Sequence, residues 1–417
     1  MNFQYKNPLF ATVLLLLFLP VYQTYAQSGS HGPIISKIDS LIQSEVNQKH
    51  IPGAVILIEK DGKVLHRKAF GYAYEFDYHM KRLKHPVNMQ VNTMFDLASL
   101  TKVFATTFGI MQLVGEGKIH LDTPVHEYLP EFHGPHKDSV TVRQLLNHTS
   151  GLNEWQPLYY EASNSKETYR EICHMPLKYA VGAARHYSDL GFMMLGYLIH
   201  HITGQPINQY LEEHLYKPLG LHHTTYNPLK EGFTNIAATS HGNPFEKKMV
   251  YDDHFGYKCD VDPHSWNGWR RYTLKGRVSD GNAWYANQGI AGHAGLFSTI
   301  SDLQKLVELM LNEGVYKGRR YIKASVIREF TTKDRYGNGL GWDMAPDVIM
   351  ADGAPNDAYG HTGFTGTNVV VIPDYHLFYI LLTNRENAGV SKEGYYFNLN
   401  PLRHKISALV LNGFGHN

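Results

Sequence analysis

The chain has 417 residues, of which 43% are hydrophobic, which excludes a disordered or fibrous protein and is enough to bury a large core. Its 39 basic and 38 acidic residues give a formal net charge of +1. This balance does not favour nucleic acid or anionic lipid as a partner, and we expect neither. The length alone suggests two or three domains, but a single domain made of two parts fits as well.

The first residues have the pattern of a secretory signal peptide. Lys6 supplies a weak positive start, residues 9–19 are almost entirely apolar, and Thr24-Tyr25-Ala26 resembles a cleavage site. The apolar run is too short for an ordinary membrane-spanning helix. We therefore predict that residues 1–26 are cleaved near Ala26, that no stable membrane anchor remains, and that the mature protein is periplasmic or secreted. The alternative is an uncleaved anchor.

The segment after the signal predicts a helix followed by a β-hairpin. Apolar residues at helical spacing indicate an amphipathic helix over residues 34–46. Two strand-like runs, residues 53–59 and 63–70, then flank an Asp61-Gly62 turn, which is typical of an antiparallel hairpin.

The remainder predicts helices in the middle of the chain and strands near its end. Residues 225–290 show little periodicity and predict a long loop region. The other expected elements are helices at 103–114, 142–147, 190–202 and 401–411 and strands at 368–373 and 378–383.

Strands at both ends with helices between them predict an α+β fold. The N- and C-terminal segments, about 34–98 and 291–413, would form one antiparallel sheet flanked by helices. Residues 99–290 would form a mostly helical and loop subdomain beside it, all within a single domain of residues 27–417. A cleft between the two parts is the natural place for a functional site.

The two cysteines and a group of tryptophans leave alternatives open. Cys173 and Cys259 form a disulfide in an exported protein or are buried separately. Trp266, Trp269 and Trp284, in the loop region, stack on a sugar ring or pack in a core.

Ser99 and Lys102 are the first pair that indicates catalysis. They lie three residues apart and therefore share one face of a helix that begins near Ser99. Free backbone N–H groups at a helix start favour an anion, and a lysine beside an apolar stretch either loses its proton readily or finds partners. Such a lysine can activate a serine hydroxyl. The alternative is a helix cap followed by a lysine that reaches solvent.

Two further motifs follow along the chain. Tyr187-Ser188-Asp189 precedes an apolar helix, so Ser188 or Asp189 is an ordinary N-cap, whereas Tyr187 is either core packing or an acid/base with a pKa lowered by Lys102. His361-Thr362-Gly363 precedes a strand and is either a surface turn or a strand edge that supplies an oxyanion donor.

The three motifs in this order resemble the serine β-lactamase and penicillin-binding protein superfamily, nearest to its class C branch and the related esterases and D-amino-peptidases. The resemblance spans roughly residues 34–411 and includes residues 141–152 (TVRQLLNHTSGL) and 291–303 (AGHAGLFSTISDL). It implies an acyl-enzyme hydrolase with Ser99 as nucleophile, Lys102 as proton acceptor and Tyr187 as acid/base.

The resemblance also implies a substrate-binding set. It places the oxyanion hole at the N–H groups of Ser99 and Phe364 and gives His361 the task of steering a substrate carboxylate. The set comprises Asp189, His361, Thr362, Gly363 and Phe364.

Two residues depart from the family pattern. Asp189 stands where Asn is usual and would keep Lys102 charged, and His361 stands where many members have Lys. Both changes disfavour efficient antibiotic hydrolysis.

The sequence thus predicts an exported serine hydrolase that cuts an amide or ester bond in cell-wall-derived peptides, as a D-alanyl carboxypeptidase, muropeptide amidase or esterase. The expected partner is a small-molecule or peptide substrate, including peptidoglycan fragments. The alternatives are a β-lactamase of modest activity and a penicillin-binding sensor that does not turn over. We expect no cofactor and no metal, since the histidines form no recognised zinc pattern, and no Gly-x-Ser-x-Gly elbow surrounds Ser99.

Overall fold

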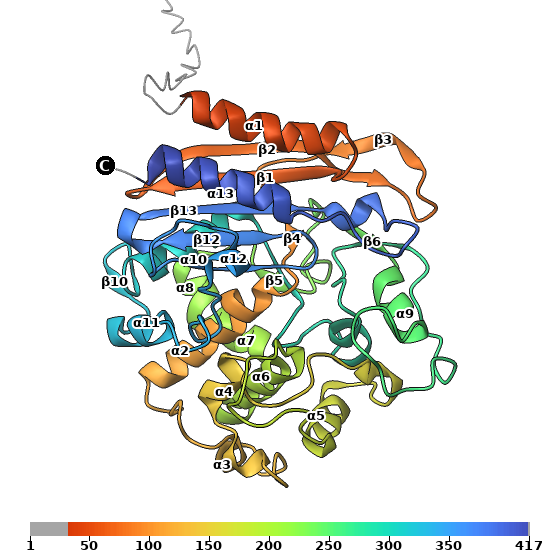
Figure 1. Ribbon diagram of the computed structural model, residues 1–417, viewed down its shortest axis with the longest axis vertical. Helices are drawn as coiled ribbons and strands as arrows, with labels where there is room; N and C mark the ends of the chain where they lie inside the picture. The colour runs from red at the N-terminus through yellow and green to blue at the C-terminus, as the bar shows by residue number, and fades with distance from the viewer. Residues whose placement is uncertain (1–31, 416–417) are drawn as a thin grey trace, which may run out of the picture.

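The protein is described by a computed structural model that covers residues 32–415 (Figure 1). The predicted signal peptide, residues 1–26, lies outside the described residues. A six-stranded antiparallel sheet in the order β11-β12-β13-β1-β2-β3 joins the two ends of the chain. Its strands are β1 (Gly53–Lys60), β2 (Lys63–Phe76), β3 (Arg82–Asn88), β11 (Tyr359–Thr362), β12 (Asn368–Ile372) and β13 (Leu377–Thr383).

The predicted hairpin is present as β1 and β2. Lys60 pairs with Lys63, so the loop has the two residues Asp61 and Gly62. Both have positive φ, +50° and +69°, as the tight turn of a twisted hairpin requires. β1 pairs with β13 on its other side, which places the two chain ends next to each other in the sheet centre.

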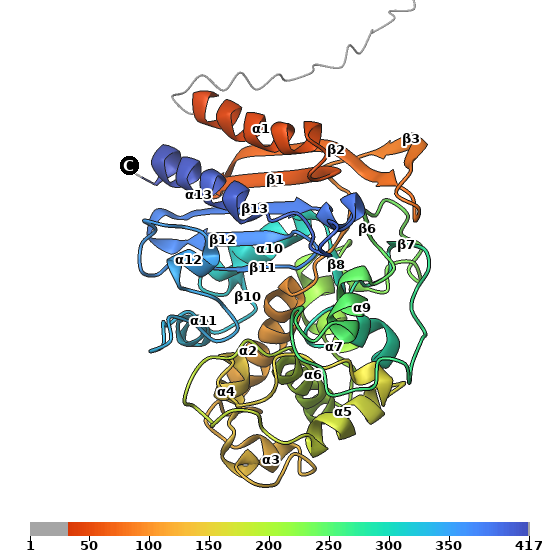
Figure 2. The same ribbon diagram turned by 45° about the vertical axis from the view of Figure 1, so that its right-hand side comes forward.

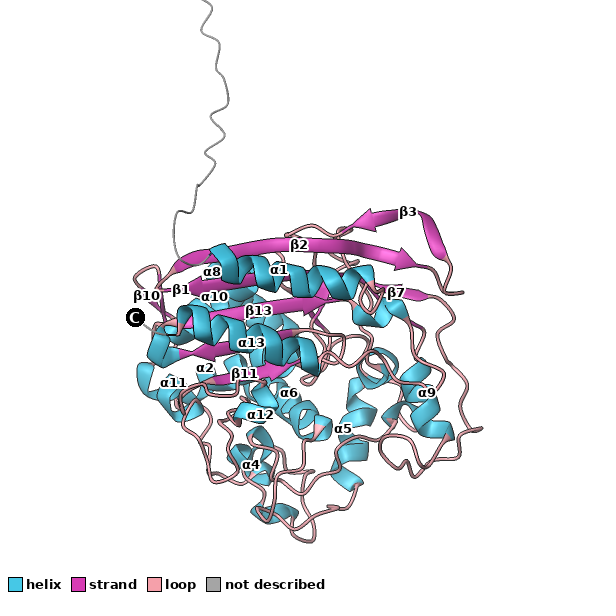
Figure 3. Cartoon of the chain, turned by 45° about the horizontal axis from the view of Figure 1, so that its top comes forward, coloured by secondary structure: helices cyan, strands magenta, loops and turns pink. Residues whose placement is uncertain are grey.

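Alternate residues of the central strands face two separate cores. In β1, Val55 and Leu57 belong to the core shared with the helical part, whereas Ala54, Ile56 and Ile58 face the opposite side. On that opposite face lie α1 (Gly32–Asn47) and α13 (Asn400–Phe414), which run side by side roughly along the strands (Figures 2 and 3). Both faces are covered, which explains why these strands are apolar throughout.

The other face of the sheet packs on α10 (Ile300–Leu311) and, beyond it, on the helical part. The helical segments of this part are η1 (Lys102–Thr107), α2 (Phe108–Gly115), α3 (Val125–Tyr128), η2 (Lys137–Ser139), α4 (Val142–Leu146), η3 (Leu158–Tyr160), α5 (Ser165–His174), α6 (Asp189–Thr203), α7 (Ile207–Leu211), η4 (Glu212–Tyr216), α8 (Lys217–Leu219), α9 (Pro244–Tyr251), η5 (Asn282–Ala286) and α11 (Ala324–Phe330). The short helix α12 (Pro346–Ile349) packs on β11 and contributes Ile349 to the core on the α1 and α13 side. The predicted α+β fold is confirmed.

Short strands connect the two parts. β8 (Leu296–Ser298) pairs with β4 (Phe95–Asp96) and with β5 (Thr225–Tyr226), so segments from three distant regions meet just before Ser99. The other strands are β6 (Ala238–His241), β7 (Thr273–Lys275), β9 (Val315–Tyr316) and β10 (Arg319–Arg320), and two short 3-10 turns are η6 (Pro373–Tyr375) and η7 (Arg385–Ala388).

The predicted loop region 225–290 is mostly irregular but includes α9, η5 and short strands. Trp266 and Trp269 pack against each other and against Tyr159, with ring centroids 4.8–5.8 Å apart, so they belong to an aromatic cluster. Cys173 and Cys259 are unbonded, which overturns the disulfide alternative. In the described part of the chain, no helix combines the length and apolar character that a bilayer crossing needs.

Candidate active site

Ser99 lies at a sharp turn between strand β4 and the helix that begins at Leu100. The turn is held by the Asp96 carboxylate, which accepts a hydrogen bond from the Ala98 N–H at 2.9 Å. Ala98 has φ of +47°, an uncommon conformation for a residue with a side chain. The result is that Ser99 is partly exposed while its neighbours Ala98 and Leu100 are buried.

Lys102 is fully buried one turn later and points back to Ser99. Its Nζ donates to Ser99 Oγ at 3.0 Å and to the backbone carbonyl of His293 at 3.4 Å. It forms an ion pair with Asp189 Oδ1 at 2.6 Å. Desolvation on its own lowers the pKa of Lys102, but the negative charge of Asp189 and the Tyr187 phenol outweigh it and raise the pKa. The expectation that Asp189 keeps this lysine charged agrees with the geometry.

Tyr187 completes the group. Lys102 Nζ lies 4.8 Å from the centroid of the Tyr187 ring, and the phenol hydrogen-bonds both Lys102 and Ser99. Desolvation raises the pKa of Tyr187, and the opposing charge of Lys102 does not overcome it. The prediction that Lys102 lowers this pKa below its ordinary value was therefore wrong, because burial in the crevice has the larger effect.

The segment Tyr187–Asp189 is positioned by α6 and its cap. Ser188 is the N-cap, and its Oγ accepts from the Gly191 N–H at 3.1 Å. The Ser188 N–H donates to His148 Nδ1 at 2.9 Å, and the His148 ring packs 4.5 Å from the Tyr187 ring. His148 thus fixes the direction in which the phenol points.

The predicted motif His361-Thr362-Gly363 ends at Gly363, which lies against Leu97 in the turn before Ser99. A Cβ at Gly363 would collide with the carbonyl of Leu97, so only glycine allows this close approach. Thr365 Oγ1 donates to the Asp96 carbonyl at 2.7 Å, and Thr367 Oγ1 donates to the Leu97 carbonyl at 3.0 Å. These hydrogen bonds hold the segment after Gly363 against the segment before Ser99.

The backbone N–H groups of Ser99 and Phe364 are both available. Neither donates a hydrogen bond to another residue in the range 32–415. Because Gly363 brings its segment against that of Ser99, the two N–H groups flank the same region, as an oxyanion hole requires.

His361 lies beside Tyr187 but outside the cavity. It is buried, its Nδ1 lies 2.8 Å from the Thr362 carbonyl oxygen, and its ring centroid is 6.0 Å from that of Tyr187. His361, Thr362 and Gly363 do not line the cavity described next, whereas Phe364 and Asp189 do. Contact between His361 and a substrate carboxylate stays a prediction.

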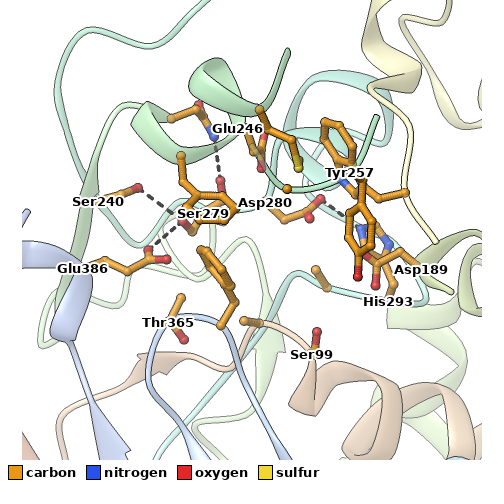
Figure 4. Close-up of a pocket in the computed structure, with 18 of the residues that line it drawn as sticks. Ser99, Asp189, Ser240, Glu246, Tyr257, Ser279, Asp280, His293, Thr365 and Glu386 are labelled. Carbon is orange, nitrogen blue, oxygen red and sulfur yellow. Dashed lines mark hydrogen bonds and ion pairs between the residues drawn. The ribbon is translucent and has the colours of Figure 1, made fainter. Parts of the chain in front are cut away.

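A cavity of about 400 Å³ opens in front of Ser99 (Figure 4). Ser99, Tyr187 and Asp189 line it near the catalytic group, and Glu246, Ser279 and Glu386 line it farther away. Its apolar lining includes Trp155, Phe245, Met249, Phe364 and Tyr396.

Comparison with known proteins decides the family. Residues 38–399 match the family model described as Beta-lactamase. The chain belongs to the Beta-lactamase family. This β-lactamase-family protein is a serine hydrolase, and the sequence resemblance is confirmed.

Two relatives match nearly the whole length of this family member. It is 33% identical to the N-acetylmuramyl-L-alanine amidase of Bacillus subtilis (strain 168), over 92% of this chain and 91% of the relative. It is 36% identical to a putative D-alanyl-D-alanine carboxypeptidase of Salmonella agona, over 93% of each. Among solved structures, a class C β-lactamase from Rhodobacter sphaeroides superposes with a TM-score of 0.63 at 17% identity, over 90% of this chain and 98% of that one. This last likeness concerns the fold.

Sequence reasoning missed several polar residues of this β-lactamase-family site. His148 and His293 both lie within the segments that carry the family resemblance, which is the signal that could have found them. Glu246 lies in α9, Glu386 in η7 and Asp280 in an irregular segment, and none of them carries such a signal.

Asp189, Asp280 and His293 have the composition of a metal site. The ligand atoms of Asp189, Asp280 and His293 lie within 4.8 Å of one another. Each group already has a partner, since Asp189 pairs with Lys102 and Asp280 accepts from His293 Nε2 at 2.9 Å. The Lys102 ammonium beside them opposes a second cation, so we assign no metal here.

Proposed function

We propose that the protein is an exported serine hydrolase that cuts an amide or ester bond in cell-wall-derived peptides through an acyl-enzyme on Ser99. The convergence of Ser99, Lys102 and Tyr187 in one crevice is the observation that carries this proposal. The names of the two relatives, an amidase and a carboxypeptidase, support peptidoglycan fragments as the substrate class. The predicted signal peptide supports export.

Activation of Ser99 requires the neutral form of Lys102, which the ion pair with Asp189 disfavours. The neutral amine takes the proton of the Ser99 hydroxyl as the oxygen attacks the carbonyl carbon. Asp189 then stabilises the ammonium that forms, which the neutral Asn usual at this position would do less strongly.

The tetrahedral intermediate then collapses with help from Tyr187. Its phenol, which the raised pKa keeps protonated at neutral pH, donates to the leaving amine or alkoxide and regains a proton from Lys102. The N–H groups of Ser99 and Phe364 stabilise the oxyanion in both steps. Water repeats the sequence to release the acid.

A panel of substrates tests this function. The purified protein is incubated with a peptide ending in D-Ala-D-Ala, an N-acetylmuramyl-L-alanyl peptide and a chromogenic cephalosporin, and products are followed by mass spectrometry. We expect steady product from one of the first two and slower opening of the lactam, with Ser99→Ala as control.

The ion pair between Lys102 and Asp189 also favours a second function. A lysine held charged slows deacylation, so the same fold would serve as a sensor that is acylated once. One acyl group per chain with no continuing release would favour the sensor. Steady release after the first turnover would favour the enzyme.

A further inference from the structure

The charged side chains that line the cavity carry one sign. Five carboxyl groups line it, those of Glu154, Asp189, Glu246, Asp280 and Glu386, whereas no Lys or Arg does among the residues that the structure describes. The chain as a whole is nearly neutral, with a net charge of +1, so the acidic lining is local to the cavity.

Three of the five carboxyl groups have a cationic or ionisable partner. Asp189 pairs with Lys102 at 2.6 Å, and Glu154 pairs with Lys178 at 2.9 Å. Asp280 lies 2.9 Å from His293 Nε2. These pairs account for the carboxyl groups nearest the reaction.

Glu386 has no such partner although it is wholly buried. Its Oε2 accepts from Ser279 Oγ at 2.8 Å, and its Oε1 has no hydrogen-bond partner among residues 32–415. Desolvation raises the pKa of Glu386 to about 7. An unpartnered carboxyl oxygen at the wall of a cavity is an acceptor that a ligand can satisfy.

Glu246 is likewise held only by neutral donors. Its Oε1 accepts from the Gly281 N–H at 2.7 Å, and its Oε2 lies 3.4 Å from the Tyr159 hydroxyl. Desolvation and the nearby Asp280 raise the pKa of Glu246 to about 8. The closest buried cation, Arg270, gives its hydrogen bonds to Asn243 and to backbone carbonyls instead.

We name Glu246, Ser279, Asp280 and Glu386 the acidic recess. Figure 4 shows the four side chains together, across the cavity from Ser99. Phe245 and Phe364 also line this cavity and pack against each other with ring centroids 5.0 Å apart. The raised pKa values of Glu386 and Glu246, about 7 and about 8, mean that both carboxyl groups often hold a proton when the cavity is empty, and a bound cation would displace that proton. The carboxylates so formed, beside aromatic rings, are the surroundings that stabilise a desolvated cation.

We propose that the acidic recess is a subsite for a primary ammonium group of the substrate, carried on the side chain of a diamino acid residue. This inference rests on the proposed function in one respect, that the scissile bond lies at Ser99. A bound ammonium donates to Glu246 and to the Ser279 hydroxyl, and Glu386 beneath Ser279 adds its negative charge as it releases its proton. A neutral sugar could also hydrogen-bond these carboxyl groups, but it would leave them protonated and gain no charge–charge attraction from them.

Binding to the Ser99→Ala protein tests the subsite without turnover. Four pentapeptides that end in D-Ala-D-Ala differ only at the third residue, which is lysine, diaminopimelate, Nε-acetyl-lysine or norleucine. Calorimetry should give at least tenfold tighter binding for the lysine peptide than for either neutral peptide. The diaminopimelate peptide separates the two natural sources of such an amine, because its extra carboxylate is repelled by the acidic lining and should weaken binding relative to lysine.

Substitutions test which carboxyl groups cause the preference for the amine. Glu246→Gln and Glu386→Gln, each made in the Ser99→Ala protein, should reduce the preference for the amine to less than threefold while the melting temperature shows a folded protein. Glu154→Gln is the matched control, because this carboxyl also lines the cavity but already pairs with Lys178, and the preference should survive.

The contradicting results are distinct from failure of the proposed function. Equal binding of the amine and acetylated peptides, no binding of either, or a full preference in both Gln variants would overturn the subsite. The hydrolase proposal would still stand if Ser99 turned over any substrate of the panel described above.

Discussion

The two ends of the cavity differ in how their charges are compensated. Around Ser99, the ammonium of Lys102 meets the carboxylate of Asp189 at 2.6 Å, and the site is balanced before any substrate arrives. In the acidic recess, Glu246 and Glu386 have only neutral partners. The comparison teaches that the catalytic end is built to move protons among groups already present, whereas the recess needs a group from outside to complete it.

Removing the nucleophile Ser99 should abolish catalysis at this end of the cavity. Ser99→Ala should lower kcat by about 10⁴-fold or more, since no other group can form the acyl-enzyme, with the melting temperature unchanged within a few degrees. Steady-state hydrolysis of a chromogenic ester measures it. Wild-type rates in this variant would remove Ser99 from the mechanism.

Removing the phenol tests the second member of the catalytic end. Tyr187→Phe should lower kcat by about 10²-fold or more, the range of general acid catalysis, because the leaving group then departs without a proton. Esters with better leaving groups should be affected less. A loss of under threefold on a poor leaving group would show that Tyr187 only packs against His148.

Removing the acid beside Lys102 shifts the pH profile. Only the neutral form of Lys102 can accept the Ser99 proton, and Asp189 raises the pKa of Lys102, so kcat/KM of the wild type should rise about tenfold per pH unit from pH 7 to 9. In Asp189→Asn, the charge that raises the pKa of Lys102 is gone, so the same rise should occur at lower pH and kcat/KM at pH 7 should exceed that of the wild type. An unshifted profile in the variant would contradict the assignment of Lys102 as a base that Asp189 controls.

The recess should make the protein less stable as pH rises. Desolvation raises the pKa of Glu386 to about 7, so the folded state keeps a proton that the unfolded state releases above about pH 4.5. The free energy of unfolding should therefore decrease between pH 5 and pH 8, and Glu386→Gln should make this decrease smaller by about 2 kcal/mol. Urea unfolding at the two pH values measures it, and an equal decrease in both proteins would refute the assignment.

The two regions also differ in how far the sequence predicts them. Ser99 and Lys102 are three residues apart, and the β1–β2 hairpin has an Asp-Gly turn, so local rules suffice for both. The signal for Tyr187 came from the family resemblance. Its raised pKa could not be foreseen, because burial there depends on segments as distant as His148 and His361.

The recess was beyond prediction for a related reason. Glu246, Ser279 and Asp280 lie in the aperiodic region 225–290, and Glu386 follows the last strand of the sheet. Nothing in the local pattern distinguishes these carboxyl groups from exposed ones. Glu386 is buried because β2 and β6, which are distant in sequence, pack against η7. Sequence reasoning cannot foresee that packing, and without the burial Glu386 would be an ordinary surface carboxyl group.

Intact-mass spectrometry of rapidly quenched reactions tests the central claim most directly. During turnover of a cell-wall peptide or a slow lactam, the account predicts a mass increase of one acyl group that maps to the peptide containing Ser99, decays as product accumulates and is absent in Ser99→Ala. An adduct on another residue, or steady product release by the Ser99→Ala protein, would contradict it.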